Sequence, residues 1–212
     1  IKEANAGTVW AQLVGRLGLK AIVVEGSPED AGWWGLHITK DGAEFFPADD
    51  YAGQGLTEIF PALFERFGKK VGIAAIGVAG EHRMSMAGVC FNDIDNRASR
   101  YAGRGGLGAV MGSKGLKLIV VDGAGGPGVD IADKALFDQG RKKLADALRS
   151  HAITKPGGAL NSYGTAVLVN IVNEAGGFPT RNFREGRFED AAKISGEAMA
   201  EFCENRGGVG MM

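Results

Sequence analysis

The chain has 212 residues, 45% of them hydrophobic, which is enough to bury a core in one domain or in parts of two. Its formal net charge of -1 gives no long-range attraction for nucleic acid or for an anionic membrane, so the expected partners are small molecules or other proteins. The two cysteines lack metal-ligand spacing and no apolar run reaches about 18 residues, so we expect a cytoplasmic protein without a disulfide framework, zinc knuckle or membrane span.

The first predicted element is a short helix. Apolar residues recur at helical spacing over residues 9–17, and Gly18 ends the pattern. Asn5 and Gly7 belong to a polar turn ahead of this helix, where backbone N–H groups and the helix dipole favour an anion. Both residues are therefore candidate phosphate contacts, and a simple N-cap is the alternative interpretation.

Strand signals follow the helix. Residues 20–25 form a continuous apolar run, which is typical of a strand buried on both faces. Residues 33–38 and 43–46 flank an Asp-Gly turn at 41–42, and this pattern predicts a β-hairpin. His37 lies in the hairpin without a second histidine or carboxylate at ligand spacing, so we interpret it as a structural residue.

A helix and a second hairpin are predicted next. Residues 57–67 place apolar side chains on one side of a helix, with Pro61 in its first turn, where proline is tolerated. Residues 71–78 read as a buried strand, and residues 84–91 as a strand that could pair with it. Cys90 in this second strand is expected to pack as a small apolar group.

The stretch 100–121 holds six glycines and four basic side chains, and it ends in an apolar strand at residues 116–121. Glycine lets successive backbone N–H groups turn toward one anion, and Arg100 and Arg104 can add charge-assisted hydrogen bonds. We interpret the stretch as a phosphate cradle. A tight glycine-rich turn without a ligand is the alternative.

Neither of two common phosphate motifs fits this stretch well. A P-loop requires Gly-Lys-Ser/Thr, whereas Ser113 and Lys114 stand in reversed order. Residues 103–108 satisfy the dinucleotide pattern G-x-G-x-x-G, but a polar run at 92–100 precedes them and only residues 109–115 separate them from the next strand. A non-catalytic module that binds a phosphate or nucleotide through residues 103–108 is the alternative function.

Beyond a second glycine cluster at residues 122–129, the apolar period changes from strand to helix. Helices are predicted at 131–150, 165–173 and 189–203, and the first of them is expected to bury four apolar side chains, those of Leu136, Phe137, Leu144 and Leu148. We therefore predict an α+β fold, with mixed β-sheets and two packed helices over residues 1–128 and an all-helical segment over residues 129–212.

Several blocks of this sequence resemble the tungsten-containing aldehyde:ferredoxin oxidoreductase family. The longest block is AGRGGLGAVMGSKGLK at residues 102–117, and shorter ones lie at 4–7, 21–26, 76–81, 163–170, 179–183 and 195–200. Together they span nearly the whole chain in the family's order.

The resemblance implies a β-rich base for a tungsten or molybdenum atom held by two pterins, whose phosphates are bridged by magnesium. A [4Fe-4S] cluster would pass electrons to ferredoxin or another electron-transfer subunit, and the implied reaction oxidises a small aldehyde-type substrate. The implied contacts to pterin or phosphate groups are Gly7, Arg100, Gly103 and Arg104. In the same cofactor site, the backbone carbonyls of Asn5 and Tyr101 would bind the magnesium. A second copy of the chain, in a homo-oligomer, is also among the expected partners.

The chain also departs from the family pattern. Residues 92–100 are longer than the family's segment, and Tyr101 stands where the family has a small residue. Cys90 and Cys203 cannot supply the four thiolates of a cluster. We therefore expect the cluster ligands to lie elsewhere in a longer parent protein, and this segment alone to be inactive. No residue in it is identified as a catalytic acid or base.

Overall fold

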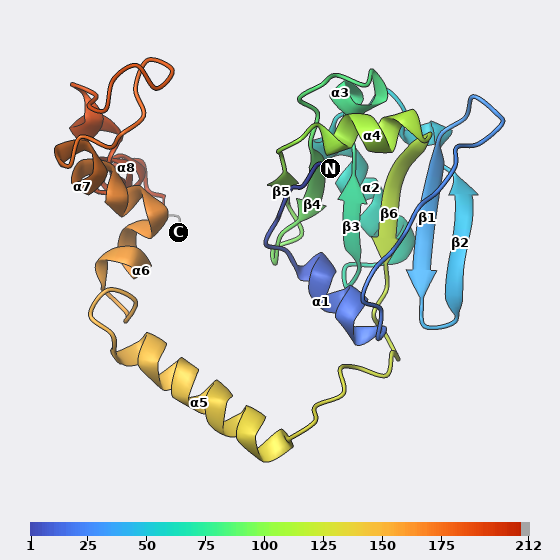
Figure 1. Cartoon of the computed structure of the whole chain (residues 1–212), viewed down its shortest axis with the longest axis horizontal. Helices are drawn as coiled ribbons and strands as arrows, with labels where there is room; N and C mark the ends of the chain where they lie inside the picture. The colour runs from blue at the N-terminus through green and yellow to red at the C-terminus, as the bar shows by residue number, and fades with distance from the viewer. Residues whose placement is uncertain (209–212) are drawn as a thin grey trace. The chain divides into compact units, whose positions relative to one another are not determined.

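A computed structural model describes residues 1–208, so the predicted helical segment extends four residues, 209–212, beyond the described part. The chain divides into two compact units, Ile1–Asp130 and Ile131–Met212. The first unit contains a six-stranded sheet with helices on both faces, and the second is built from helices (Figure 1). The fold is α+β, as predicted.

The sheet of the first unit is mixed and has the strand order β2-β1-β6-β3-β4-β5. The strands are β1 (Trp34–Thr39), β2 (Gly42–Pro47), β3 (Gly72–Ala75), β4 (Val89–Asn92), β5 (Ala98–Ala102) and β6 (Leu116–Val121). β6 lies inside the sheet, where it pairs parallel with β1 and antiparallel with β3. The β1–β2 and β4–β5 pairs are antiparallel hairpins at the two edges.

One face of the sheet is covered by α2 (Leu56–Phe67). Ile59 and Leu63 of this helix have no exposed surface and pack with Leu118 and Val120 of β6. An apolar stripe at helical spacing thus meets the alternate side chains of a strand, which is how an amphipathic helix and a sheet bury their surfaces together.

The other face is covered by α1 (Val9–Arg16) and α4 (Leu107–Ser113). Leu13 and Met111 come from these helices and pack with Leu36 and Val121 of the sheet. α3 (Val78–Glu81) packs against α4. The glycine-rich loop at 103–106 therefore runs from the edge strand β5 to a helix that is seated on the sheet.

The helices α1 and α2, the β1–β2 hairpin and strand β6 confirm predicted elements. The predicted strand at 20–25 is wrong, because this extended segment has no strand partner among the described residues. Ile22 and Val24 are half-buried, whereas Val23 is 77% exposed. The apolar run indicated extended backbone correctly but could not reveal that both edges of β1 are already paired.

The region between α2 and the glycine-rich loop differs from the prediction in three places. β3 ends at Ala75 and residues 78–81 form the one-turn helix α3, so the predicted strand is too long. β4 begins at Val89, and the residues before it form turns. The polar run at 92–100 contains the start of β5, an edge strand whose mostly exposed side chains give no apolar alternation. Pro61 lies in the second turn of α2, not the first.

The second unit contains α5 (Lys134–Ser150), α6 (Ala159–Tyr163), α7 (Leu168–Glu174) and α8 (Gly196–Glu204). The side chain of Asp133 caps α5 by accepting from the N–H of Leu136, and the side chain of Ser195 caps α8 by accepting from the N–H of Ala198. Helix α8 therefore begins at Gly196, seven residues later than the predicted start at 189. The predicted burial on α5 is wrong, because its four apolar side chains, Leu136, Phe137, Leu144 and Leu148, are 49–64% exposed. No helix within residues 1–208 combines the length and apolarity needed to cross a bilayer.

Candidate functional site

The structure brings the N-terminal segment and the glycine-rich loop together around one hollow. This hollow has a volume of about 530 Å³ and is lined by Glu3, Ala4, Asn5, Tyr101, Gly103 and Arg104. Four of the six predicted site residues therefore share it. Gly7 and Arg100 are not among the lining residues: Gly7 lies just before the N-cap of α1, and Arg100 is in β5 opposite Phe91.

The glycines of the loop fall into two classes. Gly105 and Gly106 have positive φ angles of 73° and 67°, and a Cβ on Gly106 would overlap the carbonyl oxygen of Ser85. The fold itself thus requires glycine at these positions. A Cβ on Gly103 or on Gly7 would meet no protein atom within 4 Å. At these two positions the backbone is open to a molecule from outside, as the phosphate-cradle interpretation requires.

The N-terminal segment is held against the loop by close backbone packing. A Cβ on Gly105 would lie 3.3 Å from the Cβ of Lys2 and 3.6 Å from the carbonyl oxygen of Glu3. The side-chain amide of Asn5 donates to the carboxylate of Glu3 over 3.0 Å. Glu3 is a lining residue that sequence reasoning missed, because a single exposed carboxylate in a polar segment gives no motif.

The positive charge at the hollow comes from Arg104. Its side chain is exposed, and it forms no salt bridge with any carboxylate in the described part of the chain. A guanidinium without an internal partner can offer its forked donors to an external anion. Arg100 is likewise exposed and outside the salt bridges of the described residues, but it stands outside the hollow.

Tyr101 links the hollow to the core. It pairs with Cys90 across β4 and β5, and the two side chains therefore share a face of the sheet. Burial of its hydroxyl and a hydrogen bond with Cys90 raise the pKa of Tyr101 to about 12. Cys90 has no exposed surface, which confirms its predicted role as a small core residue.

The topology around the loop excludes a dinucleotide-binding βαβ unit. A strand and a helix do flank residues 103–108, contrary to the sequence-based argument against this motif. However, β5 is antiparallel to β4, β4 to β3 and β3 to β6, so the strands before and after the loop run in opposite directions. The dinucleotide fold requires two parallel strands joined by its crossover helix.

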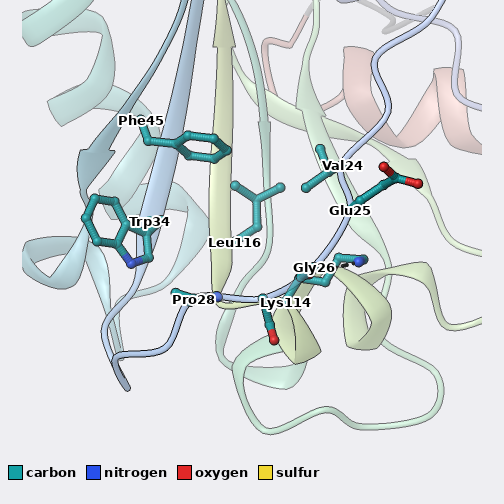
Figure 2. A pocket seen from close by; sticks show the side chains of 9 residues that line it. Val24, Glu25, Gly26, Pro28, Trp34, Phe45, Lys114 and Leu116 are labelled. Carbon is teal, nitrogen blue, oxygen red and sulfur yellow. Dashed lines mark hydrogen bonds between the residues drawn. The ribbon is translucent and has the colours of Figure 1, made fainter.

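A second hollow lies elsewhere on the first unit, and it is apolar (Figure 2). It has a volume of about 340 Å³, and Trp34, Phe45 and Leu116 form its walls with the segment that leads into β1. At its edge the ammonium of Lys114 donates to the carbonyl oxygen of Gly26 over 3.0 Å. It contains none of the predicted site residues.

The described residues form no protein-only metal centre. They contain no group of three or more histidine, cysteine, aspartate or glutamate side chains placed to hold a metal ion. Cys90 and Cys203 are both free thiols. The hollow at the glycine-rich loop offers one carboxylate and backbone carbonyls, so a hard cation there would need further oxygen ligands from a bound molecule.

Two models of known families match this chain along almost its whole length. The family model described as "Aldehyde ferredoxin oxidoreductase, N-terminal domain" matches residues 1–123, and the model for "domains 2 & 3" of the same family matches residues 139–209. The chain belongs to the aldehyde ferredoxin oxidoreductase family. The resemblance noted from the sequence blocks is thereby confirmed.

Individual members of the aldehyde ferredoxin oxidoreductase family are similar over the same length. The chain is 43% identical to the tungsten-containing aldehyde ferredoxin oxidoreductase of Pyrococcus abyssi and 42% identical to that of Thermococcus kodakarensis, in each case over 94% of this chain. It spans 31% of the length of these enzymes. The fold is similar to that of the active site complex BamBC of benzoyl coenzyme A reductase, with a TM-score of 0.67 and 22% identity over 94% of this chain and 31% of that one.

Proposed function

We propose that this chain forms one wall of a bis-pterin tungsten or molybdenum site in an enzyme that oxidises a small aldehyde-type substrate. The observation that carries the proposal is the meeting of the N-terminal segment, residues 3–5, with residues 101–104 around one hollow that contains Arg104. Family membership and the tungsten-containing relatives support the metal. Residues 1–128 would be the cofactor-binding domain and 129–212 the start of a helical domain.

The residues present fit the phosphate ends of such a cofactor. Gly7 and Gly103 leave open backbone, and Arg104 has a guanidinium free of salt bridges in the described residues. Arg104, with Arg100 close by in β5, would bind phosphate oxygens, and the backbone carbonyls of Asn5 and Tyr101 would bind a bridging magnesium. When bound, the cofactor would supply the two-electron chemistry, and this chain would hold and orient it.

The electron-transfer part of the proposal depends on residues outside this chain. Two free cysteines, one buried in the sheet core, cannot ligate a [4Fe-4S] cluster. The cluster and the contact with ferredoxin or another electron-transfer subunit would come from the rest of the parent protein, as would a homo-oligomer interface. We propose a cytoplasmic location, as expected from the cysteine usage. Alone, residues 1–212 are expected to lack turnover.

Binding of inorganic pyrophosphate tests the wall directly. Calorimetry on the 212-residue chain should show weak, salt-sensitive binding, because few charge-assisted bonds form on an exposed surface. Arg104→Ala should abolish it, whereas Arg149→Ala, which removes an exposed arginine of α5, should leave it unchanged. Equal loss in both variants would mean that only general charge attracts the anion.

Metal content tests the proposal at the level of the whole enzyme. The full-length protein, purified without oxygen after growth with tungstate and molybdate, should contain one of the two metals and reduce a dye with aldehydes. A preparation that contains neither metal would contradict the proposed activity.

The second candidate function, a non-catalytic nucleotide module, rests on the G-x-G-x-x-G spacing at 103–108. The antiparallel strands around this loop disfavour NAD. Titration with NAD and ATP beside pyrophosphate separates the two functions, since tight nucleotide binding would favour the module.

A further inference from the structure

Two of the sequence blocks end in residues that meet in the interior. Lys117, the last residue of block 102–117, lies in β6 and its side chain has no exposed surface. Its ammonium forms an ion pair with the carboxylate of Glu81, the last residue of block 76–81, and donates to the carbonyl oxygen of Ile76 over 2.8 Å. The Glu81 side chain is only 9% exposed and also accepts from the N–H of Gly53 over 2.9 Å.

The buried ion pair connects strand β6 to α3, the short helix that packs against α4 after the glycine-rich loop. Glu81 is the last residue of α3, and α3 packs against α4 without side chains between the two backbones. A Cβ on Gly112 would overlap the carbonyl oxygen of Gly80, and a Cβ on Gly108 would overlap that of Gly88. Helix α4 can therefore occupy its place only if the segment from α3 to Gly88 is held in position.

A buried ion pair is a weak source of stability, because desolvation of the two charges offsets most of their attraction. Apolar residues of similar size would fill the same space at no greater cost. What they could not supply is the set of directed bonds that ties α3 to β6 and to the backbone of Gly53. These bonds specify where α3 lies, and so where α4 and the loop before it lie.

We infer that Lys117 and Glu81 are positioning residues for the glycine-rich loop at 103–106. Neither side chain lines the hollow, so neither would contact a molecule bound there. They act in sequence: the ion pair fixes α3, α3 seats α4, and α4 fixes the loop. This inference rests on the proposed function only for what the loop binds, and the placement of the loop can be measured without any ligand.

Hydrogen–deuterium exchange of the amides in residues 103–113 measures the placement. In Lys117→Met and in Glu81→Gln, the exchange of these amides should accelerate by about tenfold relative to the amides of the sheet. This is the size expected for the loss of one coupled contact in a packed network. Ile59→Val removes a methylene from the core between α2 and the sheet. This variant should speed exchange to the same extent in the loop and in the sheet. The double variant Glu81→Gln/Lys117→Met leaves no buried charge unpaired, so it should regain stability yet keep the fast loop.

The double variant decides the question if either single variant fails to fold. A loop that exchanges as slowly as the unmodified chain in the double variant would overturn the inference, as would an Ile59→Val loop loosened to the same extent. Pyrophosphate affinity should also fall by about tenfold in the double variant and stay unchanged in Ile59→Val. If the unmodified chain does not bind pyrophosphate, the proposed function loses its support, while the exchange result still tests the positioning role.

Discussion

Gly112 in α4 lies directly against the backbone of Gly80 in α3. A Cβ at position 112 would overlap the carbonyl oxygen of Gly80 and lie 2.9 Å from its carbonyl carbon. Backbone atoms cannot move aside as the end of a flexible side chain can, so the two helices would have to separate. The contact fixes the distance between α3 and α4 at its minimum.

Gly112→Ala should therefore destabilise the first unit by about 2 kcal/mol or more, as overpacking against backbone does. Gly140→Ala is the matched control, because Gly140 is in the interior of α5 and a Cβ there meets nothing within 4 Å. That substitution should stabilise α5 by about 0.5–1 kcal/mol. Urea unfolding measures the free energy of unfolding, which should fall in Gly112→Ala and rise in Gly140→Ala. A rise in Gly112→Ala would contradict the close contact between α3 and α4.

Asp93 should make the first unit sensitive to acid. Burial acts to raise the pKa of Asp93, but hydrogen bonds from the backbone and side chain of Arg97, the hydroxyl of Ser99 and the backbone of Asp95 outweigh it and lower the pKa from 3.8 to about 2. A depressed folded-state pKa means that the contribution is complete above about pH 4 and is lost as the pH falls toward 2.

Asp93→Asn should thus lower the melting temperature at pH 7, by an amount equivalent to about 1–2 kcal/mol, because a charged acceptor is lost. The difference from the unmodified chain should shrink steadily between about pH 4 and pH 2. Asp95→Asn, at a carboxylate that is 62% exposed, should change little at either pH. A constant difference across this range would show that the charge of Asp93 is not involved.

The two thiols should differ in reactivity. Burial raises the pKa of the Cys90 thiol, and its side chain has no exposed surface, whereas Cys203 in α8 is half-buried. The thiolate is the reactive form, so an alkylating reagent should modify Cys203 of the native chain quickly and Cys90 only on unfolding. Cys203→Ser should remove the fast reaction. Fast labelling that survives in this variant would place Cys90 at the surface.

Leucines of α5 and α2 should respond differently to truncation. Leu63 in α2 is fully buried, and Leu63→Ala should cost about 2–5 kcal/mol. Leu144 in α5 is 63% exposed, and Leu144→Ala should change stability by no more than about 0.5 kcal/mol. Thermal unfolding of the 212-residue chain measures both. A large loss in Leu144→Ala would show that a neighbour covers this face of α5.

The sequence predicted elements whose signals are local. The Asp-Gly turn at 41–42 fixes the β1–β2 hairpin, the apolar run at 116–121 matches β6, and the apolar stripe at 57–67 matches α2 within one residue. In each case a turn or a period within the segment determines the backbone. The prediction that the glycine-rich loop contacts a ligand also depends on a local signal, because the composition of the loop is unusual in itself.

The errors concern features that depend on a distant neighbour. Residues 20–25 have the composition of a strand but no partner in the described sheet, and β5 has a partner but not the composition. The amphipathic spacing of α5 shows which side is apolar, not whether anything covers it. Glu3 lines the hollow only because tertiary packing brings the N-terminal segment to Tyr101. That juxtaposition has no signature within either segment.

The central place of β6 also determines when the sheet can be completed during synthesis. Without β6 the strands form two separate groups, β2-β1 and β3-β4-β5, and no other strand joins them. Each hairpin can form as soon as it leaves the ribosome, because its contacts are local. The facing edges of β1 and β3 must then remain unpaired until residue 121 has emerged, so this is the interval in which the nascent chain is most exposed to mispairing.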